Sequence, residues 1–121
     1  MKNTKSMKLN KDFRRLYYRG KSVVRSNIVV YVQQSRKKYN TLGLTCGKSI
    51  GKAVKRNRVK RLMRESYRLL EADINIGYDI VLVARSGAVS CKCVHILRDL
   101  QFAFNKLGLI KEDEKSSDND G

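Results

Sequence analysis

The first periodic run of apolar residues indicates a short helix. Phe13, Leu16 and Tyr17 are spaced i, i+3 and i+4, so all three fall on one face of a helix. Asn10 is of a residue type that caps helix N-termini, and Gly20 is of the type that most often follows a helix. We therefore expect a helix from about residue 10 to residue 20 with one apolar stripe.

The period of the pattern then changes from helical to alternating. Residues 27–34 (NIVVYVQQ) are rich in β-branched and aromatic side chains, which predicts a strand. Residues 41–46 (TLGLTC) predict a second strand, and the polar segment 35–40 between them predicts a hairpin loop. A further short strand near Ser22–Arg25 is compatible with this pattern.

The second half of the chain predicts two longer helices around one strand. A flexible basic loop, 47–51, precedes a helix over about 52–71, and a second helix runs from Ser90 to near Gly108. Between them, 78–84 (YDIVLVA) has the continuous apolar run of an interior strand covered on both faces. The element order is therefore α-β-β-α-β-α, and we expect a small two-layer α/β sandwich.

Charge is distributed unevenly along the chain. The 121 residues, enough for one domain, include 27 Lys and Arg against 11 Asp and Glu, for a net charge of +16. The segment 111–121 (KEDEKSSDNDG) carries −3, which leaves +19 for residues 1–110. We expect residues 1–110 to form the folded domain and the acidic tail 111–121 to be disordered. A domain of this charge attracts polyanions, so nucleic acid is the leading partner class.

The basic charge is most concentrated on the helix expected over 52–71. Its apolar residues fall on one arc, which we expect to face the core: Val59, Leu62, Met63, Leu69 and Leu70. On the opposite arc Asn57 is the only uncharged residue, and within residues 52–70 Glu65 is the only acid against eight bases. Like charges at i, i+4 destabilise an isolated helix, by roughly 0.2–0.5 kcal/mol per pair. An external polyanion would neutralise them, and the arginine fork suits phosphate.

The same segment resembles a known family signature. Residues 48–65 (KSIGKAVKRNRVKRLMRE) are similar to the signature of the bacterial ribonuclease P protein family, whose hallmark is the sequence Arg-Asn-Arg, here residues 56–58. Weaker similarities flank it at 12–20, 42–46 and 77–85, so the resemblance spans about residues 9–107. It implies an α/β sandwich with a left-handed β-α-β crossover, against the strong right-handed default.

The resemblance also implies an activity and partners. The family's ribonucleoprotein is an endonuclease that removes the 5′ leader of precursor tRNA, and its RNA subunit, with Mg²⁺, is the catalyst. The protein subunit is expected to bind that RNA and precursor tRNA rather than DNA, with no catalytic residue, cofactor or metal of its own. Separately, the sequence has no run of 18 apolar residues and its first residues lack the apolar core of a signal peptide, so we expect a cytoplasmic protein without a membrane partner.

Two sets of site residues carry over from the family. The surface for the RNA subunit would comprise Arg56, Asn57, Arg58, Lys60, Arg61, Arg64 and Arg68. The leader would lie in a cleft between the first helix and the sheet, against Phe13, Tyr17 and Tyr31. Aromatic rings accept any base by stacking, which suits a leader of variable sequence. Whether Tyr17 or Tyr18 faces the cleft stays open, as does the alternative that Phe13 and Tyr17 form a buried stripe.

Other chemistries are less well supported. Cys91, Cys93 and His95 would make three metal ligands on a strand, but helical spacing fans them apart and a fourth ligand is missing, so ordinary thiols are preferred. A nuclease acting through protein groups alone would need grouped carboxylates, and the acids outside the tail are dispersed or lack a motif. A structural ribosomal protein would share the charge and size but not the signature.

Overall fold

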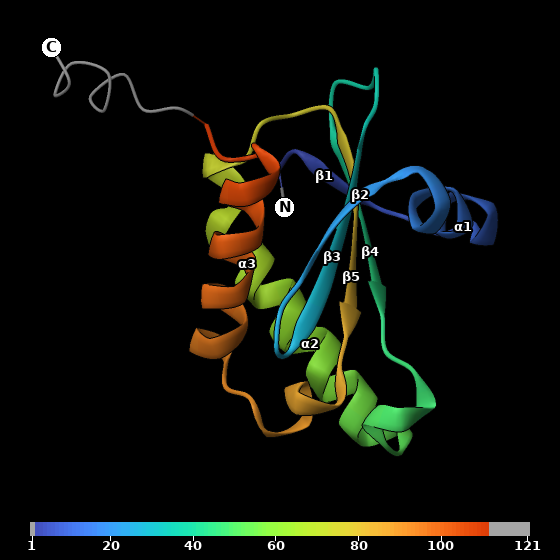
Figure 1. The fold of residues 1–121 in the computed structure, drawn as a ribbon, viewed down its shortest axis with the longest axis vertical. Helices are drawn as coiled ribbons and strands as arrows, with labels where there is room; N and C mark the ends of the chain where they lie inside the picture. Colours follow the sequence, from blue (N-terminus) through green and yellow to red (C-terminus); the bar gives the residue numbers. More distant parts are fainter. Residues whose placement is uncertain (1, 112–121) are drawn as a thin grey trace, which may run out of the picture.

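A five-stranded sheet with helices on both faces forms the core of the computed structural model, which describes residues 2–111 (Figure 1). The elements are β1 (Thr4–Ser6), α1 (Asn10–Arg19), β2 (Lys21–Val24), β3 (Ile28–Gln34), β4 (Asn40–Thr45), α2 (Ala53–Leu70), β5 (Tyr78–Ala84) and α3 (Cys93–Leu107). Short 3-10 turns lie at Lys48–Ile50, Glu71–Asp73 and Ser86–Ser90. The predicted α/β class is confirmed, and the extra strand near residue 22 is β2. The predicted acidic tail lies outside the described residues, apart from Lys111.

The strand order is β1-β4-β5-β3-β2, with β5 in the centre. It pairs in parallel with β4 and antiparallel with β3, which confirms the predicted interior strand. The predicted hairpin between β3 and β4 is wrong, because β5 lies between these two strands. Ile80, Val81 and Leu82 are fully buried although they alternate between the faces of the sheet, so only a central position covers them all.

The helices divide between the two faces of the sheet (Figure 1). α2 and α3 pack together and cover the face that carries Val30 and Ile80, forming with the sheet the two layers of the sandwich. α1 lies on the opposite face, where Leu16 packs against Val81. α2 also joins the neighbouring parallel strands β4 and β5, so this connection is a β-α-β crossover. Its left hand stays a prediction from the resemblance.

The ends of α1 show which local predictions were correct. Leu9 occupies the N-cap position without a side-chain hydrogen bond, and Asn10 is the first helical residue, so the predicted cap is wrong. Gly20 does end the helix, and its N–H donates to the Leu16 carbonyl at 2.8 Å. A Cβ atom at Gly20 would lie 2.6 Å from that carbonyl and 2.9 Å from the Val32 carbonyl. Close approach of two backbones therefore requires glycine here.

The buried face of α2 is rotated from the predicted one. Val59, Met63 and Leu70 are buried as expected, but Leu69 is 57% exposed, and Ser66 and Tyr67 occupy the buried arc instead. The Tyr67 ring meets Phe104 of α3 edge to face, with 6.2 Å between the ring centroids. Its hydroxyl lies 2.8 Å from Thr4 Oγ1, so the polar tip of this buried ring is satisfied by β1.

Strand β1 was not predicted, because residues 4–6 are polar and show no alternation. It is held by pairing with β4 and by Glu71, whose carboxylate accepts hydrogen bonds from the N–H groups of Lys2 and Asn3 at 3.1 and 3.3 Å. Burial alone would raise the pKa of Glu71, but hydrogen bonds from Thr4 and these amides outweigh it and hold the pKa below its usual value. The ionised carboxylate therefore anchors the start of the chain to the end of α2.

Candidate nucleic-acid interface

The basic side of α2 presents the residues that the sequence predicts to contact RNA. Asn57, Arg58, Arg61, Arg64 and Arg68 are exposed, and Arg56 and Lys60 are half-buried. Glu65 is the only acid in α2, and its carboxylate pairs with Arg68 at 2.8 Å. No salt bridge within residues 2–111 involves the other five basic residues, so their charge is available to a polyanion.

Two arginines of the Arg-Asn-Arg sequence are held by backbone carbonyls. Arg56 donates to the carbonyl of Gly51, and Arg58 donates to those of Val89 and Cys91, at 3.0–3.1 Å. These bonds fix both side chains against the loops that flank α2 and α3. Arg56 and Arg58 therefore orient the start of the helix, while the exposed residues further along it are free to bind.

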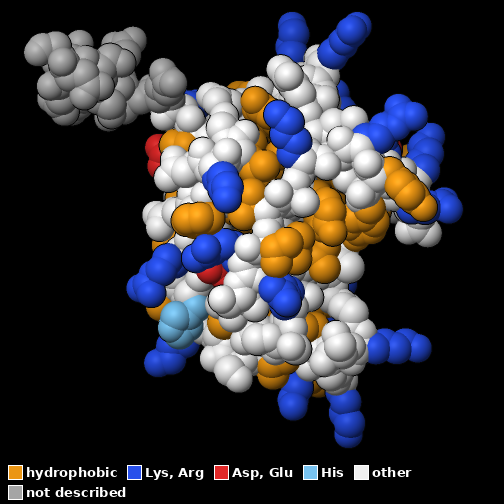
Figure 2. Space-filling model, in the orientation of Figure 1, with side chains coloured by type: hydrophobic (Ala, Val, Ile, Leu, Met, Phe, Trp, Pro, Cys, Tyr) orange, Lys and Arg blue, Asp and Glu red, His pale blue; other side chains and the backbone are white. Residues whose placement is uncertain are grey.

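An aromatic groove lies between α1 and the sheet. The rings of Tyr17 and Tyr31 meet edge to face with 5.0 Å between centroids, and the Tyr17 hydroxyl lies 3.2 Å from Thr45 Oγ1 of β4. Tyr18 is 88% exposed and Tyr17 40%. The groove residue is therefore Tyr17, and Tyr18 points away from it. Hydrophobic surface gathers between α1 and the sheet in Figure 2, to the right of centre.

Phe13 forms the other part of this groove. Its ring lies against the β4 backbone at Gly43, where a Cβ atom would be 2.6 Å from the ring, and Met7 packs beside it. Only glycine lets the ring lie this close to the strand. Phe13 is half-buried, so it keeps apolar surface accessible while it packs on the sheet. The fully buried residue of the α1 stripe is Leu16.

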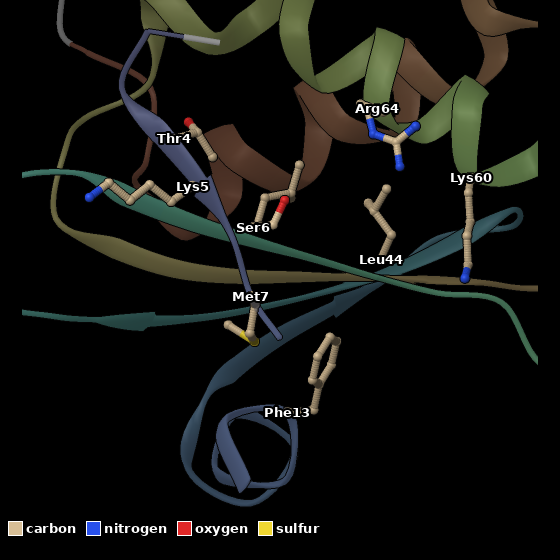
Figure 3. Close-up of a pocket in the computed structure, with 9 residues that line it drawn as sticks. Thr4, Lys5, Ser6, Met7, Phe13, Leu44, Lys60 and Arg64 are labelled. Carbon is tan, nitrogen blue, oxygen red and sulfur yellow. The ribbon is translucent and has the colours of Figure 1, made fainter. Parts of the chain in front are cut away.

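A hollow of about 370 Å³ connects the aromatic groove to the basic helix (Figure 3). Its lining includes Phe13 and Met7 on the α1 side and Lys60 and Arg64 from α2, with Leu44 of β4 between them. It opens at the edge of the sheet because β1 pairs with β4 only as far as Leu42. A second hollow of about 480 Å³ shares Phe13 and adds Tyr17, Arg14, Asn10 and Thr45.

The two hollows share Phe13 and together form one surface, on which aromatic side chains lie next to cationic ones. Rings at this spacing can stack on unpaired bases, and the adjacent Lys and Arg can bind the phosphates between those bases. Sequence reasoning missed Met7, Arg14 and Leu44 as members of this surface. Met7 directly follows β1, and because the residues of β1 are polar, the sequence pattern did not predict a strand there.

Asp79 holds α1 in the position that shapes the groove. This buried carboxylate of β5 pairs with Arg15 of α1 at 2.7 Å and with Lys37 at 3.0 Å, and it accepts a hydrogen bond from Thr41. Arg15 also binds Asp12 at 2.8 Å and Gln33 at 2.9 Å. The network therefore ties α1 to β3 and β5, and the role of Asp79 is architectural.

The carboxylates of the domain are expected to be dispensable for RNA cleavage. Asp12, Glu65, Asp79 and Asp99 each pair with a basic side chain, and no three metal-binding side chains are grouped within residues 2–111. We expect Asp→Asn or Glu→Gln at each site to preserve cleavage at saturating Mg²⁺. Of these variants only Asp79→Asn should lower the melting temperature, because it removes the charge that holds Arg15 and Lys37. The loss in unfolding free energy should be moderate, about 1–3 kcal/mol, since water partly solvates both partners. A folded, RNA-binding variant without cleavage would contradict this.

The three candidate metal ligands near α3 have separate partners. The Cys91 thiol donates to the Gly87 carbonyl at 3.3 Å, Cys93 Sγ lies 3.4 Å from Ser66 Oγ, and His95 Nδ1 accepts the Lys92 N–H at 3.0 Å. Burial raises the pKa of the Cys91 thiol, with the Asp99 carboxylate adding to the effect. His95 caps the start of α3, and the two thiols pack as small side chains.

The chain is similar to known proteins over most of its length. A family model described as Ribonuclease P matches residues 1–108. The ribonuclease P protein component of Alkaliphilus metalliredigens is 37% identical over 110 residues, which cover 91% of this chain and 99% of that protein. The corresponding protein of Clostridium kluyveri is 40% identical over 107 residues, which cover 87% and 96%.

Solved structures show the same fold. The ribonuclease P protein of Staphylococcus aureus superposes with a TM-score of 0.79 at 30% identity, covering 88% of this chain and 97% of that one. The protein from Thermotoga maritima superposes with a TM-score of 0.72 at 28% identity, covering 80% and 92%. Within residues 2–111, no helix is long and apolar enough to cross a membrane.

Proposed function

Because this chain belongs to the ribonuclease P protein family, we propose that it binds two RNAs on adjoining surfaces. The basic side of α2 would bind the RNA subunit of ribonuclease P, and the aromatic groove would bind the 5′ leader of precursor tRNA. The protein would thereby promote endonucleolytic removal of the leader in the cytoplasm. The observation that carries the proposal is the hollow in which Phe13 lies across from Lys60 and Arg64.

The groove suits a single strand better than a duplex. Its rings, from α1 and from β3, are partly exposed, so an unpaired base can stack on them. Bases in a duplex are already stacked on one another and are not available for this contact. Tyr17 and Tyr31 fix each other edge to face, which leaves little side-chain freedom to lose on binding. The groove is therefore expected to favour unpaired nucleotides with little preference for sequence.

The basic side of α2 suits a folded RNA. Its cations lie along 18 helical residues, a length of about 27 Å, which matches several consecutive phosphates rather than one small anion. Arginine predominates over lysine on this side, and the guanidinium can bind phosphate with two hydrogen bonds or stack on a base. These properties favour the RNA subunit as the partner of α2.

The chemistry of cleavage is assigned to the RNA subunit in this proposal. Magnesium bound to the RNA would supply the activated water and stabilise the leaving oxygen. The protein's side chains would bind the leader, orient it and neutralise phosphate charge where the two RNAs meet. Neutralisation of this kind lowers the concentration of Mg²⁺ needed to fold and pair the RNAs.

Reconstitution tests the proposal directly. Precursor tRNA, a bacterial ribonuclease P RNA and the full chain are mixed, and cleavage is followed as Mg²⁺ is titrated. We expect the protein to lower the Mg²⁺ concentration at half-maximal cleavage by several fold, and to do so for precursor tRNA with a leader of several nucleotides. Folded protein that binds RNA but gives no stimulation would favour a ribosomal role.

A further inference from the structure

The solvent-facing side of α3 is basic and carries an exposed aromatic residue. Arg98, Phe102 and Lys106 follow one another at i, i+4 and i+8, so they form one row along the helix. Phe102 is 45% exposed, and Asp99, the only acid of α3, is buried. No carboxylate of α3 is therefore exposed to balance these cations. Basic and hydrophobic side chains alternate over this helix in Figure 2.

Arg25, just after β2, completes the cluster. Its guanidinium stacks on the Phe102 ring at 4.0 Å from the centroid, and its Nε lies 3.4 Å from Asp99 Oδ1. Lys106 Nζ lies 5.8 Å from the same ring. Arg85 donates to the Arg25 carbonyl at 2.9 Å, so a further cation adjoins the cluster and its backbone is held as well.

These contacts leave one edge of the Arg25 guanidinium unused. Asp99 occupies the Nε side and Phe102 one planar face, and within residues 2–111 neither terminal nitrogen has a hydrogen-bond partner. The other oxygen of Asp99, Oδ2, is buried without a partner. A buried carboxylate oxygen in this state costs free energy, and a positioning role would explain why the group is present. Its effect here is to hold Arg25 by Nε while both terminal nitrogens keep their donors for another partner, and two such donors can bind a phosphate.

The cluster is separated from the hollow described above by the width of the sheet. β1 and β2 are the two edge strands, four strand spacings apart, or about 19 Å. A cationic route connects the two regions, since Arg58 of α2 binds the Val89 and Cys91 carbonyls just before α3 begins. Lys92 and Arg98 follow along α3 and are exposed. An RNA held by α2 can therefore continue along α3 to Arg25.

We propose that the edge formed by β2 and α3 is an additional phosphate-binding surface for the RNA subunit, with Arg25 as its fixed phosphate ligand and Phe102 as a stacking platform. This inference rests on the proposed function. The RNA subunit is the partner because the cations continue from its expected site on α2, whereas the leader groove lies on the opposite face of the sheet.

The test measures binding of the full chain to a bacterial ribonuclease P RNA over a range of KCl concentrations. In one variant Arg98 and Lys106, which have no salt bridge in the described structure, are both changed to Ala. The matched control removes the same charge from the exposed β3–β4 loop as Arg36→Ala with Lys38→Ala. A third variant, Arg25→Lys, keeps the charge beside Asp99 but lacks the planar fork. Melting curves verify that each variant is folded.

We expect the α3 variant to bind about tenfold more weakly and to reduce the salt slope by about two, as loss of two phosphate contacts requires. Arg25→Lys should also weaken binding several fold, and the loop control should change both quantities much less. Affinity and slope of the α3 variant equal to those of the loop control would overturn the inference. So would weaker binding of precursor tRNA with unchanged binding of the RNA subunit. Wild-type protein that fails to bind the RNA subunit would instead refute the proposed function itself.

Discussion

Changing Arg61, Arg64 and Arg68 together to Ala should weaken binding to ribonuclease P RNA by two to three orders of magnitude. These residues are exposed on α2, and each phosphate that they neutralise releases counterions. The salt slope should therefore fall by about two to three. Binding measured by filter retention or fluorescence anisotropy between 50 and 400 mM KCl gives both quantities. An unchanged slope would place the RNA-binding surface elsewhere.

The single variants should differ in a defined order. Arg64 lines the hollow and has no acid partner in the described structure, whereas Arg68 shares its charge with Glu65 at 2.8 Å. Arg64→Ala is therefore expected to cost more affinity than Arg68→Ala. Glu65→Gln is the matched control: it frees Arg68 and should strengthen binding slightly. Melting curves should show little change in stability in the triple variant, because relief of repulsion between like charges along the helix offsets the loss of the exposed Arg68–Glu65 pair.

Loss of a groove aromatic should weaken binding of precursor tRNA to the holoenzyme by about 1–3 kcal/mol per unstacked base. Phe13→Ala and Tyr31→Ala test this, and Tyr17→Ala extends it to the ring that packs on Tyr31. Binding of mature tRNA should barely change, because it has no leader. Assembly with the RNA subunit should persist, since the rings belong to α1 and β3 and every cation proposed to bind that RNA stays in place on α2.

Tyr18→Ala is the internal control for the aromatic variants. It removes the same side chain from the adjacent position of α1, but this ring is 88% exposed and points away from the groove. It should leave binding of precursor tRNA unchanged. Thermal melting separates binding from folding, because a fully buried Phe would cost roughly 3–5 kcal/mol on truncation. Equal losses for precursor and mature tRNA, or a collapsed melting transition, would assign these rings to the core instead.

Local patterns predicted most of the elements and the exposed basic side of α2. The groove residues came from the family resemblance, and RNA binding at both surfaces stays a prediction. The apolar run at 78–84 indicated a central strand, and the charge asymmetry of 52–71 indicated the exposed side of α2. Both could be predicted because the spacing of apolar and polar residues within a single segment is enough to show which side is buried. Contrary to the prediction, Leu69 is exposed and Tyr67 is buried. Helical spacing shows which residues share a side of the helix, but it does not show which residue lies at the centre of the buried side. The buried arc is centred by contacts with Phe104 and Thr4, which are distant in sequence.

What the pattern did not predict depends on pairing between distant segments. Three polar residues form β1 only because β4 offers an edge and Glu71 accepts their neighbours' amides. The supposed hairpin failed because the alternation in β3 and β4 does not say which strand separates them. The hollow between Phe13 and Arg64 also depends on this pairing, because it lies where β1 ends and leaves the edge of β4 uncovered.

The central position of β5 has a consequence for how the chain folds during synthesis. Neither β3 nor β4 can acquire its main partner until residues 78–84 have left the ribosome, so in the first half of the chain each of these strands can pair on one edge only, with β2 or β1. Long-range pairing of this kind slows folding and prolongs exposure of strand edges. During that interval the high positive charge of the nascent segment opposes self-association, since like-charged chains repel one another. The charge that serves RNA binding in the finished domain thus also protects its unfinished form from aggregation.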